Sequence, residues 1–159
     1  MDKQALLLAP STKAKPSREK TPALISMCLC GVPCRYHGKT HKMGYRLYRE
    51  KLVQKLKEEY GLIPVCPELM GGLPTPRCPC QVTWDGDNPT VTNRNTGAIL
   101  EHGVNLTEAY QAGATWACWM ADVFGAKKAF MLKQSPACDP SNGVAARALA
   151  AHGVYVKGV

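Results

Sequence analysis

The sequence lacks any hydrophobic run of the roughly 20 residues that a membrane span needs. Its apolar run near the N-terminus, residues 5–9, is shorter than the roughly 7–15 residues of a signal-peptide core. It has no helix-turn-helix pattern, RNA-binding aromatic signature or zinc-finger spacing, which argues against a nucleic-acid partner. We therefore expect a cytoplasmic protein without a membrane partner.

Length and composition predict one folded domain. The chain has 159 residues, of which 45% are hydrophobic and 20% charged, as in globular proteins. Residues 1–22 carry five basic and two acidic residues, three prolines and no apolar periodicity, which predicts a disordered basic tail before a single domain over residues 23–159. Without the tail's +3, the net charge of +8 falls to +5. This excess suits an anionic or nucleotide-like partner, or is simply a solvated basic surface.

Apolar patterns along the chain predict alternating strands and helices. We expect strands at 23–27, 62–65, 129–132 and 154–156, helices at 45–61, 105–125 and 143–153, and a small hairpin around 82–84 and 90–92. Gly61 and Gly125 are expected to end the first two helices, and Asn105 with Glu108 to cap the second. This order predicts an α/β fold: a small, mostly parallel sheet with helices on both faces, in a Rossmann-like three-layer arrangement.

Three of the eight cysteines follow predicted strands. Cys28 follows the first, Cys66 the second, and Cys138 lies in the loop after the third. Because a chain without a secretory signal has little use for structural disulfides, metal binding or catalysis is the better explanation. The carboxyl ends of parallel strands meet at one edge, so these thiols are expected to converge there as soft ligands for a metal or an iron–sulfur cluster. The alternative is that each is a small buried hydrophobe.

The other cysteines have several interpretations. Cys78 and Cys80 form a C-x-C pair in a proline-rich loop, which fits a zinc half-site, a redox pair or two ordinary loop residues. Cys30 and Cys118 are expected to serve packing.

Four ordered blocks give the chain a family resemblance: SMCLCGVPCRYHG at 26–38, VCPE at 65–68, GGLPTPR at 71–77 and KQSPAC at 133–138. Together they resemble the TudS-like thiouracil desulfidase family, formerly catalogued as a domain of unknown function, over roughly residues 23–157. The resemblance implies a 4Fe-4S cluster held by three cysteines, with the fourth iron open for sulfur. It assigns Cys28, Cys66 and Cys138 as the ligands, with Cys34 ranked below them.

The resemblance also implies acid-base and substrate-positioning roles for Glu68 and Ser135. Arg35 and Arg77 either bind an anionic substrate or brace the loop, and Gly71 and Gly72 either contact substrate or permit a tight turn. Glu68 has the alternative role of a cap or a partner for Arg77, and Ser135 that of a turn residue before Pro136. His37 and His41 are expected to face solvent, with His37 the one closer to the site.

The chain departs from the family pattern at three positions. His37 replaces the usual aspartate, Ala137 a serine and Asp139 a glycine, and the loop 139–142 is short. These changes spare the three cysteine positions and concern the substrate rather than the cluster.

The predicted function is a non-redox, 4Fe-4S-dependent desulfidase that converts C=S to C=O in a thiolated pyrimidine or a similar small molecule. A thiocarbonyl sulfur is soft enough for an open iron, while Glu68 would deprotonate the attacking water. One alternative is a metal- or cluster-binding sulfide carrier or sensor without catalysis. Another is a nucleotide-binding domain, although residues 28–38 lack the G-x-G-x-x-G of dinucleotide folds.

Overall fold

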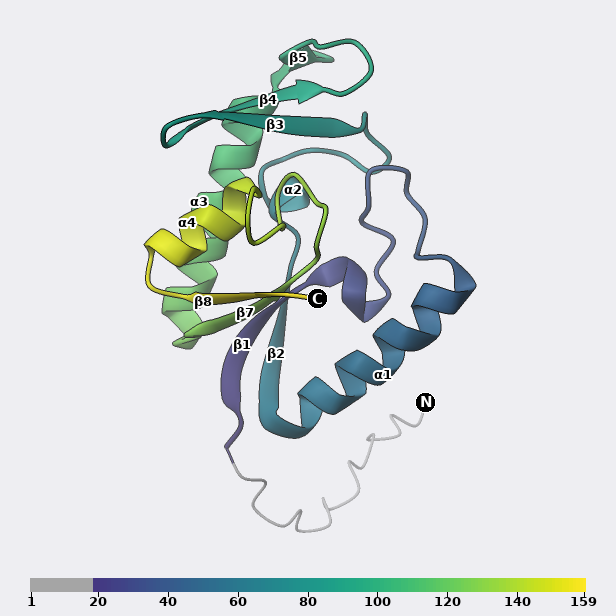
Figure 1. Ribbon diagram of the computed structural model, residues 1–159, viewed down its shortest axis with the longest axis vertical. Helices are drawn as coiled ribbons and strands as arrows, with labels where there is room; N and C mark the ends of the chain where they lie inside the picture. The colour runs from purple at the N-terminus through teal and green to yellow at the C-terminus, as the bar shows by residue number, and fades with distance from the viewer. Residues whose placement is uncertain (1–18) are drawn as a thin grey trace, which may run out of the picture.

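A parallel sheet forms the centre of the computed structural model, which describes residues 19–159 (Figure 1). Its four strands run in the order β2-β1-β7-β8, with bounds Tyr60–Val65, Thr21–Ser26, Lys128–Met131 and Tyr155–Gly158. Leu24 of β1 lies opposite Ile63 of β2 on one side and Ala129 of β7 on the other. The predicted α/β class with a mostly parallel sheet is confirmed.

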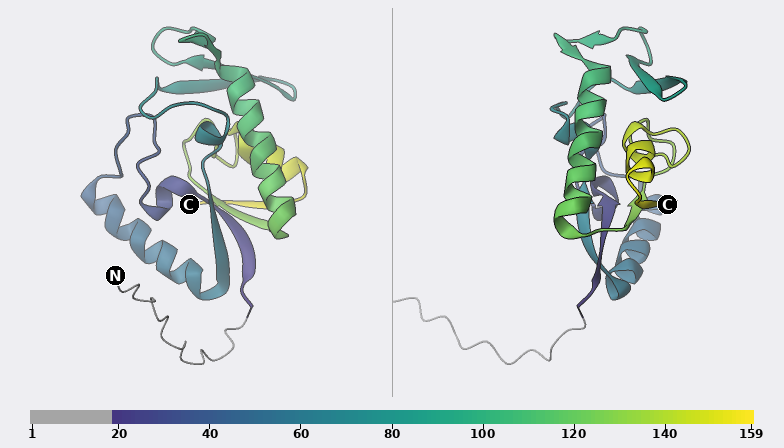
Figure 2. Two further views of the ribbon diagram at one scale, coloured as in Figure 1. Left: turned by 180° about the vertical axis from the view of Figure 1, so that it is seen from behind. Right: turned by 90° about the vertical axis from the view of Figure 1, so that its left-hand side faces the viewer.

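Helices cover both faces of this sheet. The three long helices are α1 (Met43–Glu59), α3 (Leu106–Phe124) and α4 (Val144–Ala151). Because side chains alternate along a strand, Leu24 of β1 packs with α3 and α4, whereas Ile25 packs with Val53 of α1. Figure 2 shows α1 and α3 on opposite sides of the strands.

Local sequence signals explain where helix α3 begins and ends, and the end of α1 differs from its prediction. The Asn105 side chain accepts a hydrogen bond from the Glu108 backbone N–H at 3.2 Å, and Gly125 ends α3 in the left-handed conformation at φ 66°. The helix predicted to end at Gly61 stops at Glu59 instead, because Tyr60 is already extended and Gly61 pairs with Pro22 in the sheet. β1 begins at Thr21, two residues before the predicted start of the domain at residue 23. The predicted tail lies mostly in residues 1–18, outside the described part of the chain.

Short elements complete the fold. The predicted hairpin is present as β3 (Cys80–Asp85) and β4 (Asn88–Asn93). Three short elements were not predicted: the 3-10 helix η1 (Met27–Cys30), helix α2 (Pro67–Met70) and the hairpin of β5 (Leu100–Glu101) and β6 (Val104–Asn105). Each has too few residues to show a period. Among residues 19–159, no helix is long and apolar enough to cross a membrane.

The strand order creates a natural place for a ligand. The chain runs from β1 through α1 to β2 on one side, and later returns through α3 to β7 on the other side of β1. In open parallel sheets, such a reversal leaves a crevice at the carboxyl ends of the strands.

Candidate functional site

A cavity of about 610 Å³ lies at this carboxyl edge. Residues that follow β1, β2 and β7 line it, and the chain end contributes Val159. Its volume falls within the range of roughly 300–1,000 Å³ common for small-molecule sites. Its charged lining residues are Arg35, Glu68, Arg77, Arg94 and Lys133. The cavity therefore has an excess of positive groups, which favours an electron-rich ligand.

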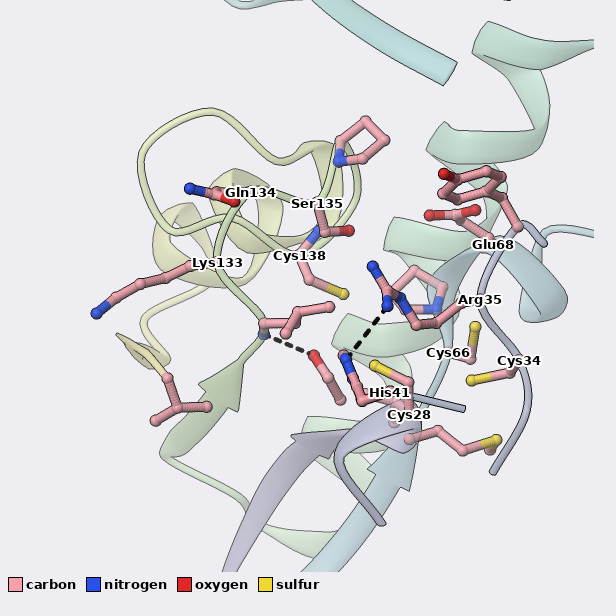
Figure 3. A pocket seen from close by; sticks show the side chains of 18 of the residues that line it. Cys28, Cys34, Arg35, His41, Cys66, Glu68, Lys133, Gln134, Ser135 and Cys138 are labelled. Carbon is pink, nitrogen blue, oxygen red and sulfur yellow. Dashed lines mark hydrogen bonds between the residues drawn. The ribbon is translucent and has the colours of Figure 1, made fainter. Parts of the chain in front are cut away.

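Four free thiols line the cavity: Cys28, Cys34, Cys66 and Cys138. All four residues are buried, with exposed fractions of 3–9%. Figure 3 shows Cys28, Cys34 and Cys66 together, with Cys138 reaching the cavity from the loop between β7 and α4. The structure thus brings the three predicted ligands to one cavity and adds Cys34, which the sequence ranked lower.

The surroundings of Cys34, Cys66 and Cys138 favour the protonated thiols. Hydrogen bonding with Cys28 raises the pKa of Cys34 to about 11, and contact with Cys34 together with burial raises the pKa of Cys66. Burial raises the pKa of Cys138 to about 12, against the opposing effect of a hydrogen bond from Ser26. Because thiolates are the metal-binding form, ligation at this site must release protons.

The donor set suits an iron–sulfur cluster. Thiolates are the usual ligands of such clusters, and the four thiols come from η1, the following loop, the start of α2 and the β7–α4 loop. Among residues 19–159, no three His, Cys, Asp or Glu side chains are arranged to hold a single metal ion. One tetrahedral ion requires sulfurs within about 4 Å of each other, whereas a cluster is ligated at separate irons and spaces its ligands further apart.

Glu68 lies in the short helix α2 and lines the same cavity. Its Oε2 atom forms a salt bridge with Arg77, and the two side chains are only 12% and 5% exposed. The structure therefore realises the pairing that the sequence left as the alternative to a catalytic role. Arg77 Nε and Nη2 both contact Oε2 of Glu68, and neither contacts Oε1.

Arg77 braces the loops beside the cavity through several hydrogen bonds. A guanidinium has five N–H donors, and those of Arg77 are directed at Glu68 Oε2, Cys34 O, Pro74 O and Thr75 Oγ1. Its backbone N–H also donates to Tyr36 O at 2.7 Å. These contacts fix Glu68 against the Cys34 loop, while the predicted contact of Arg77 with substrate stays a prediction.

Ser135 orients the loop that carries Cys138. Its Oγ accepts hydrogen bonds from the backbone N–H groups of Ala137 at 3.3 Å and Cys138 at 3.1 Å, as expected for the predicted turn residue. Ser135 also lines the cavity, so the turn role does not remove it from the site.

Asp139, one of the departures from the family pattern, closes the same loop. Its carboxylate accepts from the Gln134 N–H at 2.6 Å and from the Ser141 N–H at 2.9 Å. Together with the Ser141 hydroxyl, these hydrogen bonds outweigh burial and lower the pKa of Asp139. The short loop is therefore held by the carboxylate of the partly buried Asp139.

Arg35 and His41 form a second pair in the cavity (Figure 3). Arg35 Nη1 lies 3.2 Å from His41 Nδ1. The prediction that His41 faces solvent is wrong, because only 9% of the residue is exposed. Burial and the neighbouring Arg35 and Arg49 lower the pKa of His41 to about 4. His37 does not line the cavity.

The predicted substrate contacts from Gly71 and Gly72 are not supported, because neither residue lines the cavity. A Cβ at Gly71 would lie 1.9 Å from Ala109 O, and one at Gly113 would lie 1.8 Å from Pro67 O. These glycines let α2 pack directly on α3, while Gly72 adopts φ 90° in the turn that follows. Gly71 and Gly113 thus fix the helix that carries Glu68.

The remaining cysteines lie outside the cavity lining. The Sγ atoms of Cys78 and Cys80 are 3.8 Å apart, and Cys80 is buried at the start of β3. Cys30 is exposed, which corrects the expected packing role, and Cys118 is partly buried against the core.

Sequence reasoning missed several lining residues, including Ser26. Its hydroxyl accepts from the Leu132 N–H at 2.9 Å and so ties β1 to the segment after β7. A serine at the end of a buried strand, two residues before Cys28, was the available signal.

Comparisons with known proteins agree with this architecture. The pattern of the 2-thiouracil desulfurase family matches residues 23–157. The uncharacterized protein YbbK of Bacillus subtilis (strain 168) is 32% identical over 115 residues, which cover 72% of this chain and 71% of YbbK. The solved structure of the [4Fe-4S]-dependent thiouracil desulfidase TudS has the same fold, with a TM-score of 0.65, 24% identity, and coverage of 87% of this chain and 91% of TudS. This chain belongs to the 2-thiouracil desulfurase family.

Proposed function

We propose that the protein removes sulfur from 2-thiouracil or a closely related thiolated pyrimidine, using a 4Fe-4S cluster held by Cys28, Cys66 and Cys138. The observation that carries this proposal is the meeting of these three buried thiols with Glu68 around one cavity. The family supports the substrate class, and TudS, which shares the fold, is described as [4Fe-4S]-dependent. Cys34 is the alternative ligand, because it lies among the same thiols.

When bound, such a cluster would supply a soft Lewis acid for the thiocarbonyl sulfur. The protein's own residues have to bring water to the carbon and move its proton. Glu68, braced by Arg77, is held as a carboxylate whose Oε1 is free of the brace, and it would accept that proton as a general base. Ser135 would keep the Cys138 loop in place while substrate enters.

The overall change balances without electron transfer. One C=S bond and one water become one C=O bond and hydrogen sulfide, so neither an oxidant nor a reductant is consumed. The proton taken from water by Glu68 would return to the departing sulfide or to a ring nitrogen.

The function is tested with protein purified and reconstituted without oxygen. We expect four irons and four acid-labile sulfides for each protein chain. Only the cluster-loaded protein should convert 2-thiouracil, and it should form uracil and sulfide in equal amounts. A Cys118→Ser variant is the matched control, because this residue lies outside the cavity. Protein that holds the cluster but releases no sulfide would be a carrier or sensor instead of an enzyme. Colourless protein that contains zinc would rule out the cluster.

A further inference from the structure

Arg49 carries a buried positive charge that no acidic side chain of residues 19–159 pairs with. Only 3% of the residue is exposed, because it lies on the buried face of α1. None of the salt bridges in this part of the chain involves Arg49, and the neighbouring Glu50 pairs with Arg46 instead. Its Nε atom also has no hydrogen-bond partner. A buried charge without a partner is strongly destabilising, so this position requires an explanation.

The guanidinium of Arg49 lies against the backbone of a proposed cluster ligand. Its Nη1 atom donates to Cys28 O at 3.1 Å and to Leu29 O at 3.2 Å. Gly31 leaves room for it, because a Cβ there would lie 3.2 Å from Nη1 and the φ of 96° suits glycine. Arg49 is therefore fixed beside Cys28 from the side of α1, outside the cavity lining.

The charge of Arg49 acts on residues that do line the cavity. Burial and Arg35 lower the pKa of His41 to about 4, and Arg49 contributes to the same shift. Burial raises the pKa of Tyr45, while Arg35 and Arg49 oppose that rise. Both residues line the cavity with the four thiols. Because charges in a protein interior are poorly screened, Arg49 acts on the site without touching a bound ligand.

We propose that Arg49 is the buried counter-charge of the iron–sulfur cluster and raises the reduction potential of that cluster. This inference rests on the proposed ligation of the cluster by Cys28. A 4Fe-4S core with three thiolate ligands carries a net negative charge, and reduction adds one more. A fixed cation therefore stabilises the reduced cluster more than the oxidised one, and net charge is one of the factors that set cluster potentials.

Three substitutions of Arg49 separate its charge from its hydrogen bonds. Arg49→Lys keeps the charge, Arg49→Gln keeps an N–H donor without the charge, and Arg49→Met keeps neither. The lysine variant should stay near the wild-type reduction potential. Both neutral variants should disfavour the reduced cluster about tenfold, which for a one-electron couple is a fall of about 59 mV.

Arg46→Gln is the matched control, because it removes a cation from the same helix. The Arg46 side chain is 54% exposed and pairs with Glu50, so solvent screens its charge and the potential should not change.

A second pair of variants leaves Arg49 in place. Cys30 is exposed and lines a surface pocket together with Arg49. A carboxylate in Cys30→Asp would cancel part of the field of the guanidinium and lower the reduction potential. Cys30→Asn has a similar shape without the charge and should leave the potential unchanged.

The measurement is a redox titration of cluster-loaded protein without oxygen, with iron content and melting temperatures for each variant. If the neutral Arg49 variants fail to fold or to hold the cluster, the Cys30 pair decides. An unchanged reduction potential in Arg49→Gln or in Cys30→Asp would overturn the proposal. A fall in Arg49→Lys as large as in the neutral variants would also overturn it, because hydrogen-bond geometry would then be the cause.

Sulfide release from 2-thiouracil is measured on the same samples. Turnover consumes no electrons, so the reduction potential reports the local charge independently of catalysis. If the potentials shift as expected but no sulfide is released, the proposed function fails and the role of Arg49 stands.

Discussion

At the residue scale, the site depends on cysteines that are buried without disulfides. Cys28, Cys66 and Cys138 are each within the cavity lining, and each follows a strand of the sheet. Contact with Cys34 and burial raise the pKa of Cys66, and burial raises the pKa of Cys138. A cluster would replace those protons and offset the cost of burying a thiolate.

Replacing any one of these three cysteines with serine should abolish stable cluster binding. A serine hydroxyl is a hard, weakly acidic ligand and does not substitute for thiolate at iron. Iron and sulfide content, with visible absorbance, measures the loss, and Cys118→Ser should retain the full complement. If Cys34→Ser loses the cluster while Cys138→Ser keeps it, the third ligand is Cys34.

Glu68→Gln tests the general-base role. The amide keeps the shape of the side chain and its oxygen can still accept from Arg77, but it cannot take a proton from water. Turnover per cluster should fall by about 10²- to 10⁴-fold, with substrate affinity similar to wild type. The measurement is turnover per bound iron together with the binding constant for substrate.

Glu68→Gln has a different expected result if Glu68 is purely structural. If Glu68 only braces Arg77, the change should lower stability and cluster occupancy while turnover per cluster stays near wild type. Another group would then activate the water.

At the element scale, α2 is the piece that joins the sheet to the site. Cys66 directly follows β2, and Glu68 is the second residue of α2. The helix has only four residues, so it is held by its packing on α3 through Gly71 and Gly113. Its position is therefore a tertiary property.

Gly113→Ala should displace α2 from α3. The added methyl group would collide with Pro67 O at 1.8 Å, and overpacking of this kind costs about 1–3 kcal/mol or more. We expect a lower free energy of unfolding, measured by denaturant titration, and reduced cluster occupancy. Gly44→Ala in α1 is the matched control, because a Cβ there meets no atom within 4 Å and alanine should stabilise the helix by up to about 1 kcal/mol. Equal destabilisation by both changes would show that the α2–α3 contact is not the cause.

At the scale of the whole molecule, the proposed ligands join segments that are far apart along the chain. η1, the start of α2 and the β7–α4 loop meet only at the carboxyl edge of the sheet. A cluster bound to all three would cross-link the fold there. Its binding free energy would then add to the stability of the native state.

Cluster removal should therefore lower the melting temperature. Each 1 kcal/mol of lost stabilisation corresponds to about 2–4 °C in a domain of this size. Thermal unfolding of loaded and chelator-treated protein, both kept without oxygen, measures the shift. Identical melting temperatures would mean that the three segments are already held without the cluster.

Much of the fold was encoded locally. The Asn105 cap and Gly125 stop determine α3 through bonds between near neighbours, so sequence alone located this helix. Cys28, Cys66 and Cys138 could be placed at one edge because parallel strands end on the same side of a sheet. The strand order was not needed for that conclusion.

Only the tertiary structure decided how the polar side chains around the thiols are paired. Arg77 contacts the carbonyl of Cys34, 43 positions away, and this distant contact helps to engage the guanidinium that the sequence left as a candidate substrate ligand. His41 lies in a loop with no burial signal, yet it packs against Arg35 and Tyr45 and its Nε2 atom is left unpaired. Hydrogen-bond satisfaction depends on every group packed around an atom, and that environment is assembled only when distant segments fold together.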